Sequence, residues 1–195
     1  MIFTHVLIGV LLAAVSSLYV SNPSLLVASG AIGGALPDLD MLLTHRKTLH
    51  FPVGYSILSC VLFFIYLLSG LSTVFVLATG VSAGAVHSLM DVLGGGKEMR
   101  PWEETDDRAA FNHVTGEWIS ARRILYDGSF SDFVLATSSG VVAVSILSSR
   151  FTVLIAFLLV LSLVYVLSRK YITRVIPREY STFSSYIQEK LRNLW

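Results

Sequence analysis

Two carboxylates and two imidazoles lie close together just after an apolar segment: Asp38, Asp40, His45 and His50. Carboxylate oxygens and imidazole nitrogens are common ligands of zinc, manganese and iron in proteins. Ionisable side chains beside a long apolar segment are energetically expensive unless they have partners, and they usually mark a functional site. This stretch therefore predicts a metal site.

A second motif, His87 and Asp91, ends a later apolar segment. Residues four apart share one face of a helix, so this imidazole and carboxylate can reach the same ion. His5 opens the first apolar segment and can join them if that segment starts on the same side. The predicted ligands are His5, Asp38, Asp40, His45, His50, His87 and Asp91. They suit one or two divalent ions, with zinc the first choice and manganese or iron the alternatives.

The chemistry that such a site supports is hydrolysis. A divalent ion lowers the pKa of a bound water from about 15.7 toward 7, which supplies metal-bound hydroxide at neutral pH. Asp40 or Asp91, whichever is not a ligand, is a candidate general base. Arg46 either stabilises an anionic transition state or is an ordinary basic residue of a cytoplasmic loop. The expected reaction is attack on an ester or phosphoester.

The elements that must position these residues are membrane-length apolar segments. Hydrophobic residues make up 54% of the chain, which is typical of an integral membrane protein. No basic residue precedes the first segment, so we expect an uncleaved transmembrane helix and not a signal peptide. The sequence predicts an all-α bundle of about six spans, the second short and unwinding in its last turn, over residues 2–20, 24–36, 53–69, 72–90, 132–147 and 151–167.

The distribution of charge predicts the orientation of this multi-pass bundle. If all six segments cross, 13 of the 14 Lys and Arg residues lie on one face and only Arg150 lies on the other. Basic loops face the cytoplasm, so both termini and the predicted metal site are expected there, in the cell membrane. We therefore divide the chain into a transmembrane metal-site domain, residues 1–168, with a cytoplasmic loop at 94–131, and a tail, residues 169–195.

The loop, the tail and the helix interfaces carry further expectations. Asp106 and Asp107 resemble the first turn of a helix running toward His113, which we expect to be a surface histidine. The G-x-x-x-G spacings predict close packing between the second and fourth segments. The basic tail predicts an amphipathic helix on anionic lipid, with no specific nucleic-acid binding. The residues concerned are Gly30 and Gly34, Gly80 and Gly84, and, in the tail, Tyr180, Phe183, Ile187, Leu191 and Leu194.

Taken in order, these motifs resemble the membrane-bound metal-dependent hydrolases, also described as LexA-binding, inner-membrane-associated hydrolases. The resemblance extends to about Trp102 and is carried by Thr4-His5 with Gly9, Gly34 to Asp40, His45-Arg46 with His50, and His87 with Asp91. It implies a multi-span protein with a metal centre and hydrolase activity. Members often have Thr-His-Ser where this chain has Leu49-His50-Phe51, so the neighbouring hydroxyls are absent here. The boundary location suggests a lipid-linked or phosphoester substrate.

Three other interpretations remain open. The same residues could form the ion site of a transporter, although transporter sites usually lie near the membrane midplane. They could instead hold a structural metal in a regulatory scaffold. An intramembrane aspartyl protease is a weaker alternative, because it needs two aspartates on different helices and no histidines.

Overall fold

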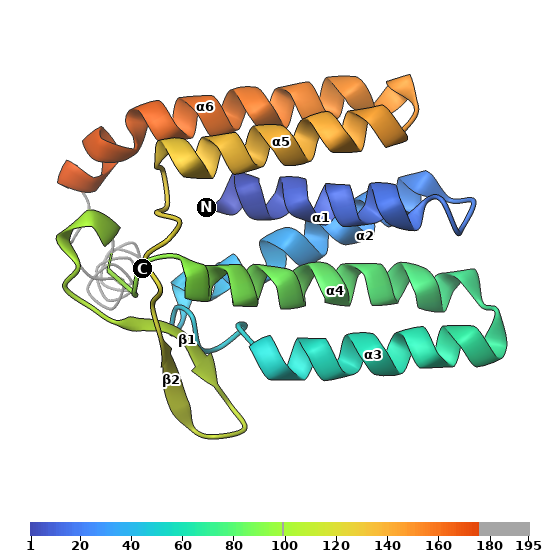
Figure 1. Cartoon of the computed structure of the whole chain (residues 1–195), viewed down its shortest axis with the longest axis horizontal. Coiled ribbons are helices and arrows are strands. Elements are labelled where there is room, and N and C mark those ends of the chain that lie inside the picture. The colour runs from blue at the N-terminus through green and yellow to red at the C-terminus, as the bar shows by residue number, and fades with distance from the viewer. Residues whose placement is uncertain (99, 176–195) are drawn as a thin grey trace, which may run out of the picture.

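Six α-helices make up most of the computed structural model, which describes residues 1–98 and 100–175. Consecutive helices run in alternating directions (Figure 1). A small two-stranded sheet lies beyond one end of the bundle. The helices are α1 (Ile2–Ser16), α2 (Pro23–Ala35), α3 (Pro52–Ser69), α4 (Ser72–Leu93), α5 (Phe130–Ile146) and α6 (Thr152–Val175), and the strands are β1 (Arg108–Asn112) and β2 (Glu117–Ser120).

Four helical segments in the described part of the chain are long and apolar enough to cross a membrane. They are Pro23–Leu42, Pro52–Ser69, Ser72–Leu93 and Ser149–Arg169. The first consists of α2 and a 3₁₀ helix, Leu36–Leu42, so the second apolar segment continues in a tighter helical form where unwinding was expected. The outer surface is strongly apolar, and Phe64, Leu67 and Leu68 of α3 are 60%, 77% and 74% exposed. Such a surface is compatible with a lipid environment.

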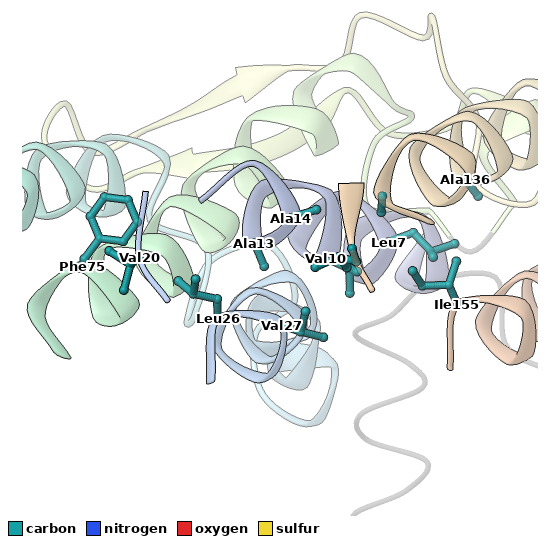
Figure 2. Packing of buried hydrophobic residues seen from close by; sticks show 12 residues of the cluster. Leu7, Val10, Ala13, Ala14, Val20, Leu26, Val27, Phe75, Ala136 and Ile155 are labelled. Atoms are coloured by element: carbon teal, nitrogen blue, oxygen red, sulfur yellow. The ribbon is translucent and has the colours of Figure 1, made fainter. Parts of the chain in front are cut away.

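Helix α1 lies at the centre of the bundle and contacts α2, α4, α5 and α6. Its side chains Leu7, Val10 and Ala13 are fully buried. Figure 2 shows them in one continuous cluster with Leu26 and Val27 of α2, Phe75 of α4, Ala136 of α5 and Ile155 of α6. His5 is therefore fixed on a helix that is held by neighbours on several sides.

Glycines bring α1, α2 and α4 into backbone contact. A methyl group on Gly33 would overlap the carbonyl of Gly80, which confirms the predicted close approach of α2 and α4. The glycines that make this contact are not the ones expected, however. Gly30 and Gly34 face α1, where they approach Gly9 and His5. A helix presents residues three and four apart to different neighbours when it is packed on two sides. These contacts set the distance between His5, the end of α2 and α4.

The segment that follows α4 contains a hairpin, so the helix predicted from Asp106 and Asp107 is wrong. Asp106 Oδ1 accepts a hydrogen bond from the backbone N–H of Arg108 (2.9 Å), which closes a turn instead of capping a helix. Strands β1 and β2 pair antiparallel, with Phe111 opposite Trp118. The N–H of Phe111 donates to the carbonyl of Arg46 (3.0 Å), which anchors the hairpin to the loop before α3. This long-range contact is invisible in the local sequence.

Helix α6 continues through residue 175, beyond the predicted start of the tail at 169. Arg169 forms an ion pair with Asp127 in the loop before α5 (2.8 Å). The predicted amphipathic helix and its residues Tyr180, Phe183, Ile187, Leu191 and Leu194 lie outside the described residues.

Candidate metal centre

Four of the predicted ligands meet at one end of the bundle. Asp38 comes from the 3₁₀ helix after α2, His50 from the loop before α3, and His87 and Asp91 from the last turns of α4. Each offers one ligand atom, and these atoms all lie within 4.8 Å of one another. Figure 1 shows that the first turn of α1, the start of α3 and the end of α4 lie at this same end, so the alternating topology brings the four together.

His87 faces two carboxylates with one ring nitrogen. Its Nδ1 lies 2.7 Å from the carbonyl of Gly34, and a carbonyl can only accept, so Nδ1 carries a proton. In the neutral imidazole Nε2 then presents a lone pair. Within residues 1–98 and 100–175 this atom has no hydrogen-bond partner, and it lies 3.5 Å from Asp38 Oδ1 and 3.8 Å from Asp91 Oδ2. Three acceptors that converge in a buried place require a cation or a proton between them.

His50 is fully buried between two carboxylates. Its Nδ1 lies 2.8 Å from Asp40 Oδ2, and its Nε2 lies 2.9 Å from Asp91 Oδ2. Burial opposes the charged imidazolium, but the hydrogen bonds to Asp40 and Asp91 outweigh it and raise the pKa of His50 to about 9. The surroundings therefore favour positive charge at this position. If Nε2 binds a metal ion, Asp40 can still accept the Nδ1 proton and orient the ring.

Asp40 is completely buried and its carboxylate is fully occupied by hydrogen bonds. Oδ1 accepts from His45 Nδ1 (2.8 Å) and the Arg46 N–H (3.2 Å). Oδ2 faces His50 and also accepts from the Leu49 N–H (3.2 Å). A carboxylate offers about four acceptor positions, so these four groups saturate it. Burial lowers the pKa of His45, which makes the neutral ring the favoured form there. Asp40 and His45 thus lie beside the ligand atoms and shape the loop that carries His50.

His5 and Arg46 also contact Asp91. His5 Nε2 lies 3.3 Å from Asp91 Oδ1, and its ring stacks on His87 with centroids 3.7 Å apart. Arg46 is buried, its Nε lies 3.5 Å from Asp91 Oδ2, and it also donates to the carbonyl of Gly95. The side chain therefore lies at the site and not in a solvated loop.

A pocket of about 30 Å³ opens beside the cluster and is lined by His5, Asp38, Arg46 and Asp91. This volume accommodates a water molecule or an ion. The pocket is also lined by Glu98, which the sequence analysis did not single out. The signal available in the sequence was a carboxylate shortly after His87 and Asp91, in a loop otherwise rich in glycine.

His113 lies apart from these residues, on the turn of the hairpin. Its side chain is exposed, and its ring packs against Phe51 and Phe111 with centroids 4.4 and 5.0 Å apart. The structure agrees with the expected surface position and makes His113 a suitable control for experiments on the other histidines.

The donor set fits a divalent ion. Two imidazole nitrogens and two carboxylate oxygens suit zinc, manganese or iron, and Nε2 of His87 faces the carboxylates of Asp38 and Asp91. Comparison with known proteins found no matching family model, no matching curated protein and no matching solved structure. The resemblance to membrane-bound metal-dependent hydrolases therefore remains a prediction, and the function has to be argued from the site itself.

Proposed function

We propose that this protein is a six-span integral membrane protein that binds a divalent metal ion at its cytoplasmic boundary and hydrolyses an ester or phosphoester there. The observation that carries the proposal is the convergence of Asp38, His50, His87 and Asp91, with ligand atoms within 4.8 Å of one another. In the part of the chain that the structure describes, no hydrogen bond satisfies Nε2 of His87, so the arrangement is incomplete without a cation or a proton.

The membrane part of the proposal is supported by the four membrane-length helices and by the alternating directions of all six (Figure 1). Helices α1 and α5 have 15 and 17 residues and are short for a hydrocarbon core of about 30 Å. In this proposal the polar end of the bundle lies in the headgroup region. The apolar length that α1 and α5 must span is therefore shorter. The excess of Lys and Arg at that end supports a cytoplasmic orientation with both termini inside.

Each residue of the site has a proposed task. Asp38, His50, His87 and Asp91 hold the ion, and Asp40 orients His50 through Nδ1, as carboxylates commonly do behind metal-binding histidines. A bound divalent ion would lower the pKa of water enough to supply hydroxide at neutral pH.

The remaining groups act on the substrate and on protons. Arg46 places a guanidinium beside the pocket, where it can stabilise the developing negative charge on an ester or phosphoryl oxygen. Oδ2 of Asp91 contacts the two ligand imidazoles, which leaves Oδ1, near His5, as the candidate general base. A lipid or lipid-linked ester can reach this position from the membrane boundary.

The test is hydrolysis by detergent-purified protein, stripped with a chelator and reloaded with zinc, manganese or iron(II). The probes are a p-nitrophenyl carboxylic ester, bis(p-nitrophenyl) phosphate and a phospholipid. We expect metal-dependent hydrolysis of at least one probe, about 100-fold or more slower in His87→Ala and unchanged in His113→Ala. Equal rates in wild type and His87→Ala would contradict the proposal.

A structural metal in a scaffold is the second candidate. It is favoured by one observation, the direct hydrogen bonds of His50 to both Asp40 and Asp91, which tie three segments together. In that case the protein binds metal, hydrolyses none of the probes and loses stability when the metal is removed. A transporter receives less support, since the buried ionisable side chains named above gather at one end.

A further inference from the structure

Glu98 is a buried carboxylate to which none of the tasks above is assigned. It follows the glycines at the end of α4, its residue is 4% exposed, and neither side-chain oxygen has a hydrogen-bond partner in another residue of the described part of the chain. Buried carboxylates nearly always have partners, because the ionised form is expensive to desolvate. A carboxylate without one, beside a candidate active site, is suited to a proton-transfer role.

The local backbone directs Glu98 toward the site. It lines the same pocket as His5, Asp38, Arg46 and Asp91. A Cβ on Gly96 would meet Glu98 Oε2, so the absence of a side chain there makes room for the carboxylate. The neighbouring carbonyl of Gly95 accepts from Arg46 Nη1. One short loop thus holds both the guanidinium and the acid against the pocket.

The surroundings favour the protonated acid. Burial raises the pKa of Glu98, and its own backbone N–H together with the positive charges of Arg123 and Arg46 opposes this only in part. A general acid has to hold its proton until the leaving group needs it, and enzymes commonly achieve this by burying a carboxyl. Arg46 can then stabilise the carboxylate that remains after transfer.

We propose that Glu98 is the proton donor to the leaving oxygen of the substrate, an inference that rests on the proposed hydrolase function. Hydroxide forms a bond to the carbonyl carbon or phosphorus, and the bond to the alkoxy oxygen breaks with its electron pair on that oxygen. The oxygen takes the proton of the Glu98 carboxyl and leaves as an alcohol. Water then returns a proton to the carboxylate. The preferred substrates are accordingly esters of alcohols, whose alkoxides are poor leaving groups, and the expected class includes lipid alcohols.

The first experiment compares two esters of the same acid, a p-nitrophenyl ester and an ethyl ester, in metal-loaded wild type, Glu98→Gln and Glu117→Gln. Nitrophenolate leaves without a proton, whereas ethoxide needs one. Glu98→Gln should be about 100-fold slower on the ethyl ester and within about threefold of wild type on the p-nitrophenyl ester. Glu117 is exposed on β2, so its variant should match wild type on both.

The second experiment needs no metal and no turnover. Infrared spectroscopy of the metal-free protein should show a protonated carboxyl band at neutral pH that is absent in Glu98→Gln and present in Glu117→Gln. Glu98→Asp, which keeps the acid but shortens it, should retain a carboxyl band and recover part of the ethyl ester activity. Elemental analysis should find equal metal content in wild type and Glu98→Gln.

The outcomes separate the two proposals. Hydrolysis by wild type with no change in Glu98→Gln, or with an equal fall on both esters, would overturn the donor role and leave the hydrolase standing. Loss of metal in Glu98→Gln would make Glu98 a ligand and overturn the donor role as well. Absence of hydrolysis of every probe by metal-loaded wild type would overturn the hydrolase and the donor role together.

Discussion

The two ends of the bundle carry opposite kinds of side chains on the same helices. At one end α1 carries His5 and α4 carries His87 and Asp91, around a pocket of about 30 Å³. At the other end the same two helices contribute apolar and aromatic surface to a groove of about 480 Å³. That groove is lined by Val15, Ser16, Tyr19, Phe63, Tyr66, Leu67 and Phe75.

This difference separates two sources of stability. At the apolar end each side chain contributes packing, and loss of one leaves a cavity but no unpaired charge. At the polar end Asp91 contacts His5, Arg46 and His50, so loss of one group leaves buried charges without partners. Variants of Asp91 and of the groups that contact it should therefore change metal affinity and stability together, whereas variants at the apolar end should change stability alone.

Asp91→Ala should have the largest effect, because it removes a ligand and the common partner of His5, His50 and Arg46. We expect loss of measurable zinc binding by calorimetry and a fall of about 3–5 kcal/mol in the free energy of unfolding in detergent. Zinc affinity equal to that of wild type would show that Asp91 is not a ligand.

Phe75→Ala should destabilise the apolar end by about 3 kcal/mol, since it empties the space between Phe63 and Tyr66, whose rings lie 5.5 and 4.6 Å from that of Phe75. Zinc affinity of the folded variant should stay within about twofold of wild type. A large loss of affinity would mean that the two ends are coupled and that the separation drawn above is wrong.

Asp40→Asn should weaken zinc binding by about 10–100-fold without abolishing it, the usual consequence of changing a group that orients a metal-binding histidine. The amide keeps the size of the side chain but presents a donor to one of its hydrogen-bonded neighbours. The measurement is a calorimetric titration beside His113→Ala, which should bind as wild type does. Complete loss of binding would place Asp40 among the ligands, as the sequence first suggested.

Asp127→Asn should have the smallest effect and a defined pH dependence. Burial alone would raise the pKa of Asp127, but the Met1 ammonium and Arg169 lower it from its ordinary value of 3.8 to about 2. The carboxylate therefore stabilises the fold above about pH 4, and this contribution is lost as the pH falls through about 2. The difference corresponds to about 2 kcal/mol.

The check is the free energy of unfolding of wild type and Asp127→Asn as a function of pH. The two should differ most at neutral pH and converge in strong acid, while zinc affinity stays unchanged. A constant difference down to pH 2 would show that the ion pair with Arg169 does not hold α6 in place.

The helices and the gathering of His5, Asp38, His50, His87 and Asp91 could be predicted from the sequence. Apolar runs end where the chain must turn, so the predicted segments match the helices to within a few residues except at the ends of α1 and α6. Alternation of direction then places every second loop at the same end of the bundle. The 3₁₀ helix Leu36–Leu42, which extends the second segment, was not predicted.

The parts that sequence reasoning missed depend on contacts between distant segments. The turn at Asp106 leads into a hairpin, which is anchored by the hydrogen bond from Phe111 to Arg46. The contact between α2 and α4 is made by Gly33 and Gly80, whereas Gly30 and Gly34 were expected to face α4. Asp40 is a possible metal ligand by residue type, but its carboxylate oxygens accept hydrogen bonds from the nearby N–H groups of Arg46 and Leu49. Which carboxylate is satisfied locally depends on the fold of the loop, and residue types alone do not determine it.

The measurement that tests the central claim most directly is elemental analysis of the detergent-purified protein, with wild type beside Asp38→Ala, His87→Ala and His113→Ala. We expect one equivalent of zinc, manganese or iron in wild type and in His113→Ala, and its loss in the other two variants. No metal in wild type after incubation with each ion, or full metal content in both Asp38→Ala and His87→Ala, would contradict it.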